Sequence, residues 1–315
     1  MMFNSRQRYV HVGGQAVIEG VMMRAPKSVA IAVRRPNGEI LIKEDQWRSL
    51  SDRWRFLRWP FVRGGLIIVE AMINGMQALT FSANQALEEE EEALGSRALL
   101  ATVIAALAAG IALFVVLPHV LSGAVLHLFG ARLGVEHSVF HVVDGAIKII
   151  IFLTYVRLIS LFKEIRRIFE YHGAEHKSVY AYESGQSLTV ENARKFSTLH
   201  PRCGTAFILV VIVFSILFFS AAFPFVPKFD AFPGVVNHTI AIGMKILFMF
   251  PIAGLAYEMI KFSSSKMDHA LIRLAVLPGM WMQKFTTREP TDEQLEVALA
   301  ALRRALHINA QAEGA

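Results

Sequence analysis

The sequence predicts a mainly α-helical membrane protein with about four transmembrane helices, a small N-terminal β unit and cytoplasmic amphipathic helices. The chain has 315 residues, of which 54% are hydrophobic, and its mean hydropathy of +0.43 is too apolar for an ordinary soluble domain. Residues 98–131 and 203–227 contain no Asp, Glu, Lys or Arg. Each run exceeds the roughly 20 residues that a helix needs to cross a bilayer.

Two weaker candidate spans, 137–162 and about 235–260, complete a transmembrane region that we assign to residues 97–262. The charged residues inside these two spans are Asp144, Lys148, Arg157 and Lys245. We therefore expect four spanning helices. Three spans, or a re-entrant turn after Pro118, remain as alternatives.

The distribution of basic residues predicts the orientation in the membrane. Residues 1–97 hold 13 Lys and Arg, the loop 163–204 and the tail 261–315 hold seven each, and the loops 118–136 and 224–236 hold one each. Because basic loops stay in the cytoplasm, both termini and the loop 163–204 should be cytoplasmic. The basic residues bracket membrane segments, so an anionic lipid surface is the expected partner and nucleic acid is not.

Residues 1–46 are expected to form the β unit. The stretch "SVAIAVRRPNGEILIKE" predicts two strands around an Asn37-Gly38 turn, which is a strong hairpin signal. Before it, the glycine pair Gly13-Gly14 could cradle a phosphate, but it matches no nucleotide-binding fingerprint. We expect a tight turn there instead. The first 30 residues lack the continuous apolar core of a cleavable signal peptide.

Residues 47–96 are expected to form interfacial amphipathic helices. The segment 47–63 holds three of the four tryptophans and five arginines, and both side chains suit the lipid headgroup layer. The next helix carries one polar stripe of Glu70, Asn74 and Gln77 on an otherwise apolar surface. The pattern does not decide whether residues 64–87 lie on the membrane or within it.

The cytoplasmic tail, residues 263–315, should end in an amphipathic docking helix from about Thr291 to His307. Thr291 is a suitable N-cap, and the acidic residues that follow it suit the positive end of the helix dipole.

The most informative motif, "YHGAEHKSVYAYE", lies in the loop 163–204, where we expect the second span to continue as a helix. His172 and His176 are one turn apart on its apolar stripe, so both imidazoles could bind one metal ion. With Glu175 they form the pattern H-x-x-E-H, in which the glutamate acts as general base on a water. The alternative is that both are capped interfacial histidines.

A catalytic zinc needs a third protein ligand and an open position. The turn "HPRCGT" in the same loop offers His200 and Cys203, and soft ligands of this kind favour zinc. If both bind, the site is closed and structural, and if only one binds, a position stays open. The alternative for this turn is a helix entry with an inert thiol. Glu258, at the cytoplasmic end of the fourth span, is a further candidate ligand.

A second polar set lies toward the outer side of the membrane. His141, Asp144 and Lys148 share one face of the second span, and His238 and Lys245 belong to the fourth. Asp144 and Lys148 are four residues apart and should pair. The functional interpretation of this set is transport of a proton or small ion, and the structural one is an intrahelical ion pair.

The motifs "GGQAVIEGVMMR", "HGAEHKSVYAYE", "HPRCGT" and "LPGMWMQKFTTREP" occur in the order found in the YqhQ-like family of bacterial membrane proteins, and the chain resembles this family over about residues 10 to 307. The family is a domain of unknown function that is often labelled a predicted metal-dependent enzyme. The resemblance implies a multi-span protein of the bacterial inner membrane. The motif residues that correspond are His172, Glu175, His176, Glu183, His200, Arg202 and Cys203.

Three functions follow from these observations. The first is a membrane-embedded zinc hydrolase in which Glu175 activates water and Arg202 stabilises an oxyanion. Its substrate would be a peptide, a membrane-protein segment or a lipid headgroup. The second is a scaffold or assembly factor with a structural metal site, and the third is a small transporter that uses the second polar set.

Overall fold

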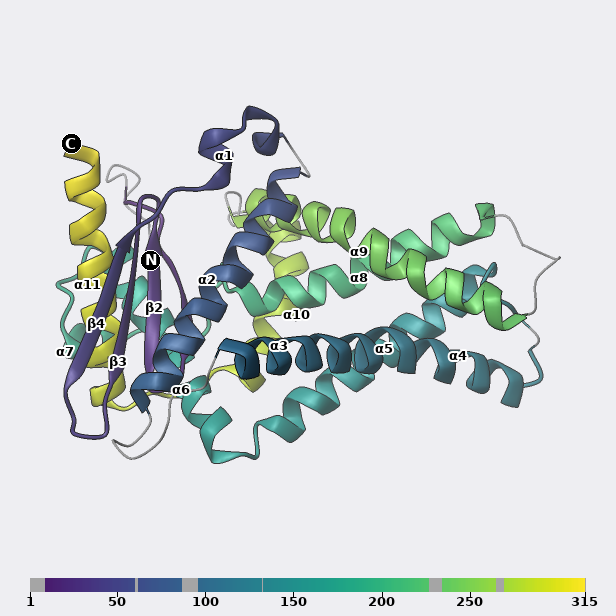
Figure 1. The fold of residues 1–315 in the computed structure, drawn as a ribbon, viewed down its shortest axis with the longest axis horizontal. Coiled ribbons are helices and arrows are strands. Elements are labelled where there is room, and N and C mark those ends of the chain that lie inside the picture. Colours follow the sequence, from purple (N-terminus) through teal and green to yellow (C-terminus); the bar gives the residue numbers. More distant parts are fainter. Residues whose placement is uncertain are drawn as a thin grey trace.

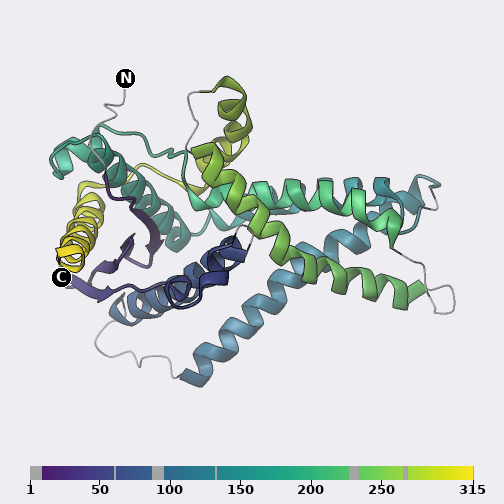
Figure 2. The ribbon, with the colours of Figure 1, turned by 90° about the horizontal axis from the view of Figure 1, so that it is seen from above.

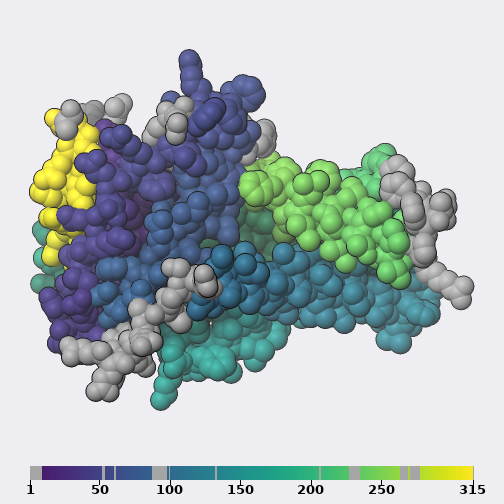
Figure 3. All heavy atoms as spheres, viewed as in Figure 1, coloured from purple at the N-terminus to yellow at the C-terminus, as the bar shows by residue number. Residues whose placement is uncertain are grey.

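The computed structural model describes residues 9–59, 62–86, 96–131, 133–226, 234–264 and 269–314. A β-sheet with covering helices forms one end of the molecule, and a bundle of long helices projects from it (Figure 1). In the space-filling view the bundle is the narrower body, and the end that holds the sheet is broader (Figure 3). The protein is therefore a helical membrane protein with a β-containing domain at one end of its bundle.

The N-terminal domain is built on a four-stranded antiparallel meander in the order β1-β2-β3-β4. Its strands are β1 (Gly13–Val17), β2 (Gly20–Ala25), β3 (Ser28–Arg34) and β4 (Ile40–Gln46). The predicted hairpin at Asn37-Gly38 is confirmed: Gly38 has a φ of 87°, which only glycine adopts without strain. Gly13 and Gly14 lie within β1, so the turn predicted for them was wrong.

The two faces of the sheet are covered by different helices. Val21 and Met23 of β2 pack with helices α6 (Lys163–Glu183) and α11 (Asp292–Gly314). On the other face, Val17 and Met22 pack against Ala78 of helix α2 (Val62–Ala86). Alternate residues of a strand point to opposite faces, which explains why Met22 and Met23 are buried in different layers.

Five helical segments are long and apolar enough to cross a membrane: Val62–Ala86, Leu100–Leu128, Ser138–Ile159, Phe207–Phe225 and Val235–Phe262. The elements that form them are α2, α3 (Ser96–Ile111), the π-helical turn η2 (Ala112–Val116), α4 (Leu117–Leu128), α5 (Ser138–Ile159), α8 (Gly204–Ala222), η3 (Phe223–Phe225) and α9 (Gly234–Ser264).

The packing of the sheet argues against α2 as a spanning helix. The sheet precedes α2 in the chain, and it packs against α6, which follows α5. If the segment α3–α4 and helix α5 cross the bilayer as a pair, they return the chain to its starting side, and a spanning α2 would then leave the sheet and α6 on opposite sides. Figures 1 and 2 show α2 beside the sheet, at an angle to the bundle. Five segments are therefore candidates for spanning the membrane, one more than predicted, and this arrangement is consistent with four of them crossing it.

Glu70 and Asn74 of the predicted polar stripe are buried on the side of α2 that faces the domain, whereas Gln77 is exposed together with the apolar side. Glu70 is 2% exposed and accepts hydrogen bonds of 2.8 Å from Ser49 Oγ and from the Leu50 backbone N–H. Met72 and Ile73 on the other side are exposed. A helix with one face on a protein domain and an apolar face outward is suited to the membrane interface.

The segment before α2 forms two short helices, α1 (Leu50–Arg53) and the 3-10 helix η1 (Arg55–Arg58), rather than one interfacial helix. Trp54 has an extended backbone and separates them. Trp54, Phe56 and Trp59 are exposed, as expected for side chains that enter a headgroup layer.

The expected continuation of the second span into the motif helix was wrong. Helix α5 ends at Ile159, and α6 begins at Lys163 after Phe162, whose backbone is extended. The Ser160 hydroxyl donates a 2.7 Å hydrogen bond to the Arg157 carbonyl and ends the span. Helix α6 ends at Glu183, and Gly185 with a φ of 68° follows it, as predicted.

The predicted tail helix is present as α11, which is longer than expected and covers the sheet. The Thr291 hydroxyl accepts from the Gln294 N–H at 3.3 Å, and the Gln294 side chain accepts from the Thr291 N–H at 2.9 Å, which is a capping box. The remaining helices are α7 (Val190–Arg194) and α10 (Ala270–Thr286).

Candidate metal centre

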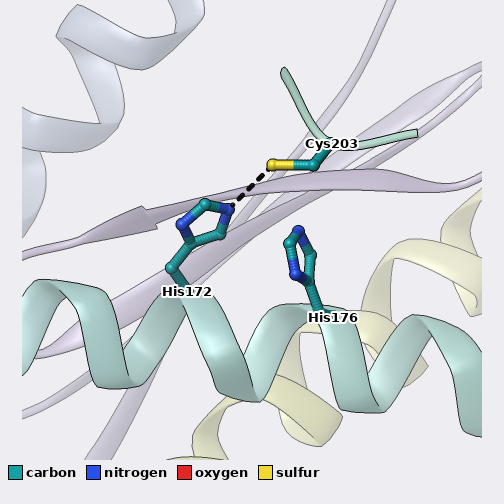
Figure 4. A group of neighbouring side chains, drawn as sticks. All are labelled: His172, His176 and Cys203. Atoms are coloured by element: carbon teal, nitrogen blue, oxygen red, sulfur yellow. Dashed lines mark hydrogen bonds between the residues drawn. The ribbon is translucent and has the colours of Figure 1, made fainter. Parts of the chain in front are cut away.

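Three of the predicted ligands converge beneath the sheet. The ligand atoms of His172, His176 and Cys203 all lie within 4.8 Å of one another, and both imidazoles of α6 point toward the thiol (Figure 4). Cys203 Sγ is 3.3 Å from His172 Nε2. Zinc bonds of about 2.0–2.3 Å at tetrahedral angles hold ligand atoms roughly 3.3–3.8 Å apart, so this pair already has the required separation.

Backbone carbonyls orient both imidazoles. His172 Nδ1 lies 2.8 Å from the Thr286 carbonyl oxygen at the end of α10, and His176 Nδ1 lies 2.5 Å from the Thr198 carbonyl oxygen. A ring nitrogen that faces a carbonyl must carry the proton, which leaves Nε2 with a free lone pair. Metal-binding histidines are commonly held in this way, so the cluster fits a metal ion.

Cys203 is placed by the start of a spanning helix. It is the N-cap of α8, and its Sγ accepts a hydrogen bond of 3.4 Å from the Thr205 N–H. The "HPRCGT" turn is thus a helix entry, but its thiol faces the histidines.

Glu175 borders the cluster. Its Oε2 is 3.5 Å from His176 Nε2, and the residue is 6% exposed. Helix α6 packs against β1 at this point, where a β-carbon built on Gly14 would lie 2.6 Å from Glu175 Cγ. Because Gly14 has no side chain, the Glu175 side chain can lie directly against β1.

His200 lies next to the cluster but outside the group of three. Its ring centroid is 5.6 Å from that of His176, and its Nε2 is 3.5 Å from a Glu183 carboxylate oxygen. Burial lowers the pKa of His200, and the negative charge of Glu175 acts in the opposite direction. The arrangement leaves Cys203 as the third candidate ligand and His200 as a neighbour.

Arg202 forms an ion pair with Glu183, and its Nη1 is 3.2 Å from His11 Nδ1. Burial lowers the pKa of this guanidinium, and the nearby Glu175 carboxylate opposes the shift. Arg202 is therefore a positive group within the electrostatic range of Glu175.

Two supporting residues were not recognised from the sequence. The Gln283 side chain accepts from the His200 N–H at 2.8 Å and donates to the His200 carbonyl at 2.9 Å, and Thr286 provides the carbonyl beside His172. Both belong to the stretch "LPGMWMQKFTTREP", whose periodicity indicates only a helix. Gly173 is in close contact with this segment, because a β-carbon there would overlap with the Arg288 carbonyl oxygen.

The structure does not bring Glu258 into this group. Its two carboxylate oxygens accept from Nε and Nη2 of Arg63, a bidentate pair that joins α9 to the start of the α2 segment. Glu258 therefore contributes to the α2–α9 contact, and the proposed role as a ligand has no geometric support.

The fold and the cluster together define a polytopic helical membrane protein that carries a His₂Cys group where a β-containing domain joins its bundle. A family model described as "Protein of unknown function (DUF1385)" matches residues 59–308, and the chain belongs to this family. It is also 32% identical over 317 residues to the "Uncharacterized protein YqhQ" of Bacillus subtilis (strain 168), with 96% of this chain and 94% of that protein covered. No solved structure was found to match.

Proposed function

We propose that the protein is a metal-dependent membrane hydrolase whose ion is bound by His172, His176 and Cys203. The observation that carries this proposal is the convergence of three ligand atoms from two separate segments, with both Nδ1 atoms facing carbonyls. Two imidazoles and one thiolate suit zinc best among common divalent ions. Three protein ligands leave one position for water or substrate.

The bound ion would supply Lewis acidity to a water molecule or to a carbonyl or phosphoryl oxygen. Glu175 is the proposed general base, because its carboxylate lies beside His176 Nε2 and would take the proton from the attacking water. Arg202 is the proposed partner of the developing negative charge. Its ion pair with Glu183 holds it near the cluster.

The substrate class follows from the position of the cluster. Cys203 immediately precedes α8, so the proposed site lies where a spanning helix enters the bilayer. The substrate would be a peptide bond near the membrane surface or the headgroup of a lipid. We further infer that this side is the cytoplasmic face of a bacterial inner membrane, because the basic segments lie on it.

A structural metal site is the second candidate, and the same carboxylate supports it. Glu175 Oε2 is close enough to His176 Nε2 to become a fourth ligand after a small movement. Four ligands would close the site and leave no position for substrate, as expected of a scaffold protein.

The two candidates are separated by Glu175→Gln in the purified full-length protein in lipid nanodiscs. If the protein is a hydrolase, the wild type and the variant should both contain about one equivalent of zinc. Only the wild type should hydrolyse a fluorescein-labelled casein or a headgroup-labelled phospholipid. Loss of zinc from the variant would identify Glu175 as a ligand and favour the structural site. Glu164→Gln, at an exposed position of the same helix, is the matched control.

A further inference from the structure

A second cluster of ionisable side chains lies inside the membrane, in the half of the bundle that is far from the sheet. Lys148 Nζ and Lys245 Nζ each donate a 2.8 Å hydrogen bond to Asp144 Oδ2. Lys245 Nζ is also 3.1 Å from His119 Nδ1, and His119 Nε2 is 2.9 Å from His238 Nδ1. The predicted pair of Asp144 and Lys148 is therefore part of a larger network.

The network begins at an exposed residue and runs inward. His238 is exposed in the first turns of α9, whereas His119, Asp144 and Lys245 are at most 2% exposed. A π-helical turn and Pro118 directly precede His119, and π turns are frequent at functional sites. His238, close to the start of the candidate span Val235–Phe262, is thus the point at which the network reaches the surface of the protein near the outer end of the bundle.

We propose that His238 and His119 form a proton relay that loads and unloads the buried Lys245. In the loaded state the Lys245 ammonium donates to His119 Nδ1, His119 Nε2–H donates to His238 Nδ1, and His238 Nε2 carries a proton. On unloading, the lysine proton moves to His119 Nδ1, the His119 Nε2 proton moves to His238 Nδ1, and the His238 Nε2 proton leaves to water. One proton is released, and both imidazoles end neutral in the opposite tautomer.

The charges around Lys245 explain why it should lose a proton. One carboxylate, Asp144, faces two ammonium groups, and an excess charge inside the membrane is costly. His141 of α5 lies nearby and places its Nε2 2.7 Å from the Val135 carbonyl. Phe140 lies under the Lys245 ammonium, at 5.5 Å from ring centroid to Nζ. Helix α8 and η2, which also pack here, contain no ionisable residues.

Among the described residues, the relay reaches the surface of the protein at one end only. On α5, the residues that follow Lys148 toward the sheet include Phe152 and Val156, which pack with Ile212 and Met282 in an apolar cluster. This cluster separates the network from the His₂Cys group. The geometry therefore supports a proton-binding site that responds to the outer compartment, rather than a proton channel through the protein.

The test is histidine NMR on the full-length protein in lipid nanodiscs, because ¹⁵N shifts and couplings report which ring nitrogen carries the proton. With rising pH, His119 and His238 should change from the Nε2–H to the Nδ1–H tautomer over one shared pH interval. Lys245→Arg should abolish this change, since a guanidinium stays charged and fixes the loaded state. His127→Gln, at an exposed position of the same helix as His119, should leave it intact.

The relay would be overturned if His119 kept one tautomer throughout the pH range in which the wild type is folded, or if Lys245→Arg behaved as the wild type. If Lys245→Arg fails to fold, His238→Gln replaces only an exposed side chain. That variant should slow exchange of the His119 ring proton with water, and unchanged exchange would equally overturn the relay.

Discussion

Glu175 and Gly14 are in direct contact, although 161 positions separate them in the chain: the carboxylate-bearing helix lies so close to β1 that a β-carbon at position 14 would be 2.6 Å from Glu175 Cγ and 2.8 Å from the Met22 carbonyl oxygen. Because position 14 has no side chain, α6 can pack closely against β1. This contact helps to position Glu175, the proposed general base. The contact also links the N-terminal domain to the candidate metal centre.

Gly14→Ala should destabilise the domain by about 1–3 kcal/mol, because the added methyl group overpacks the contact between sheet and helix. Thermal unfolding of the purified protein measures this loss. Gly13→Ala is the control, since a β-carbon at Gly13 meets nothing within 4 Å. Equal stability of the two variants would mean that α6 and β1 are not in close contact.

His172→Ala and Cys203→Ser should lower the zinc content of the purified protein well below one equivalent, because each removes a member of the three-ligand group. His200→Gln should retain the metal, since His200 Nε2 faces Glu183 rather than the group. Elemental analysis of the three variants beside the wild type is the measurement. Loss of zinc in His200→Gln alone would reverse the assignment of the third ligand.

Gly173→Ala should weaken metal binding by about 10–100-fold, the usual effect of disturbing a residue that orients a ligand. The new methyl group displaces the Arg288 carbonyl, and Thr286, whose carbonyl orients His172, lies two residues earlier. Competition with a zinc chelator gives the affinity. Gly204→Ala lies next to Cys203 but has no atom within 4 Å of a new β-carbon, so it should bind zinc like the wild type.

Glu258→Gln should leave the zinc content unchanged and reduce stability by about 1 kcal/mol, because it removes the charge from a partly exposed pair with Arg63. Elemental analysis and thermal unfolding provide the two readings. In the double variant Arg63→Gln/Glu258→Gln, the second substitution should lower the stability by little more, because the first has already removed the ion pair. A fall in zinc would return Glu258 to the ligand set.

Tyr171→Phe should make the protein less sensitive to alkali. Burial raises the pKa of Tyr171, and the Glu19 carboxylate adds to the shift. The folded state therefore retains a proton that the unfolded state loses above about pH 10, so stability falls as the pH rises through that range. The phenylalanine variant lacks this contribution, and its stability should decline less steeply with pH. Parallel decline of both proteins would contradict the assignment.

Local patterns in the sequence predicted the elements that form from local rules. The charge-free runs marked two spans, Asn37-Gly38 marked the hairpin, and Thr291 marked the start of α11. The prediction that α5 and α6 form one helix was wrong because an apolar stripe continues across Phe162 regardless of the turn there. Periodicity reports which face is apolar, and it does not report where the backbone bends.

The sequence predicted which residue types would form the candidate group, but not whether His200 or Cys203 would join the two histidines. His172 and His176 follow from helical spacing, whereas the choice of Cys203 over His200 depends on the turn that begins α8 and on the side chain of Gln283. His119 was missed in the membrane network because it lies in an otherwise apolar span and its partners are on another helix. Contacts between distant segments leave no periodic signal in a single sequence.

The sheet is formed by residues that precede α11 by about 250 positions in the chain, and one of its faces is covered by α11. At about 5–20 residues per second, roughly 15–60 s separate the two on the ribosome. During that interval the candidate spans are made, and Val21 and Met23 can pack against α6 but not against α11. This face of the sheet can therefore be covered only after α11 has been made, and a nascent chain arrested before α11 should be a substrate for chaperones.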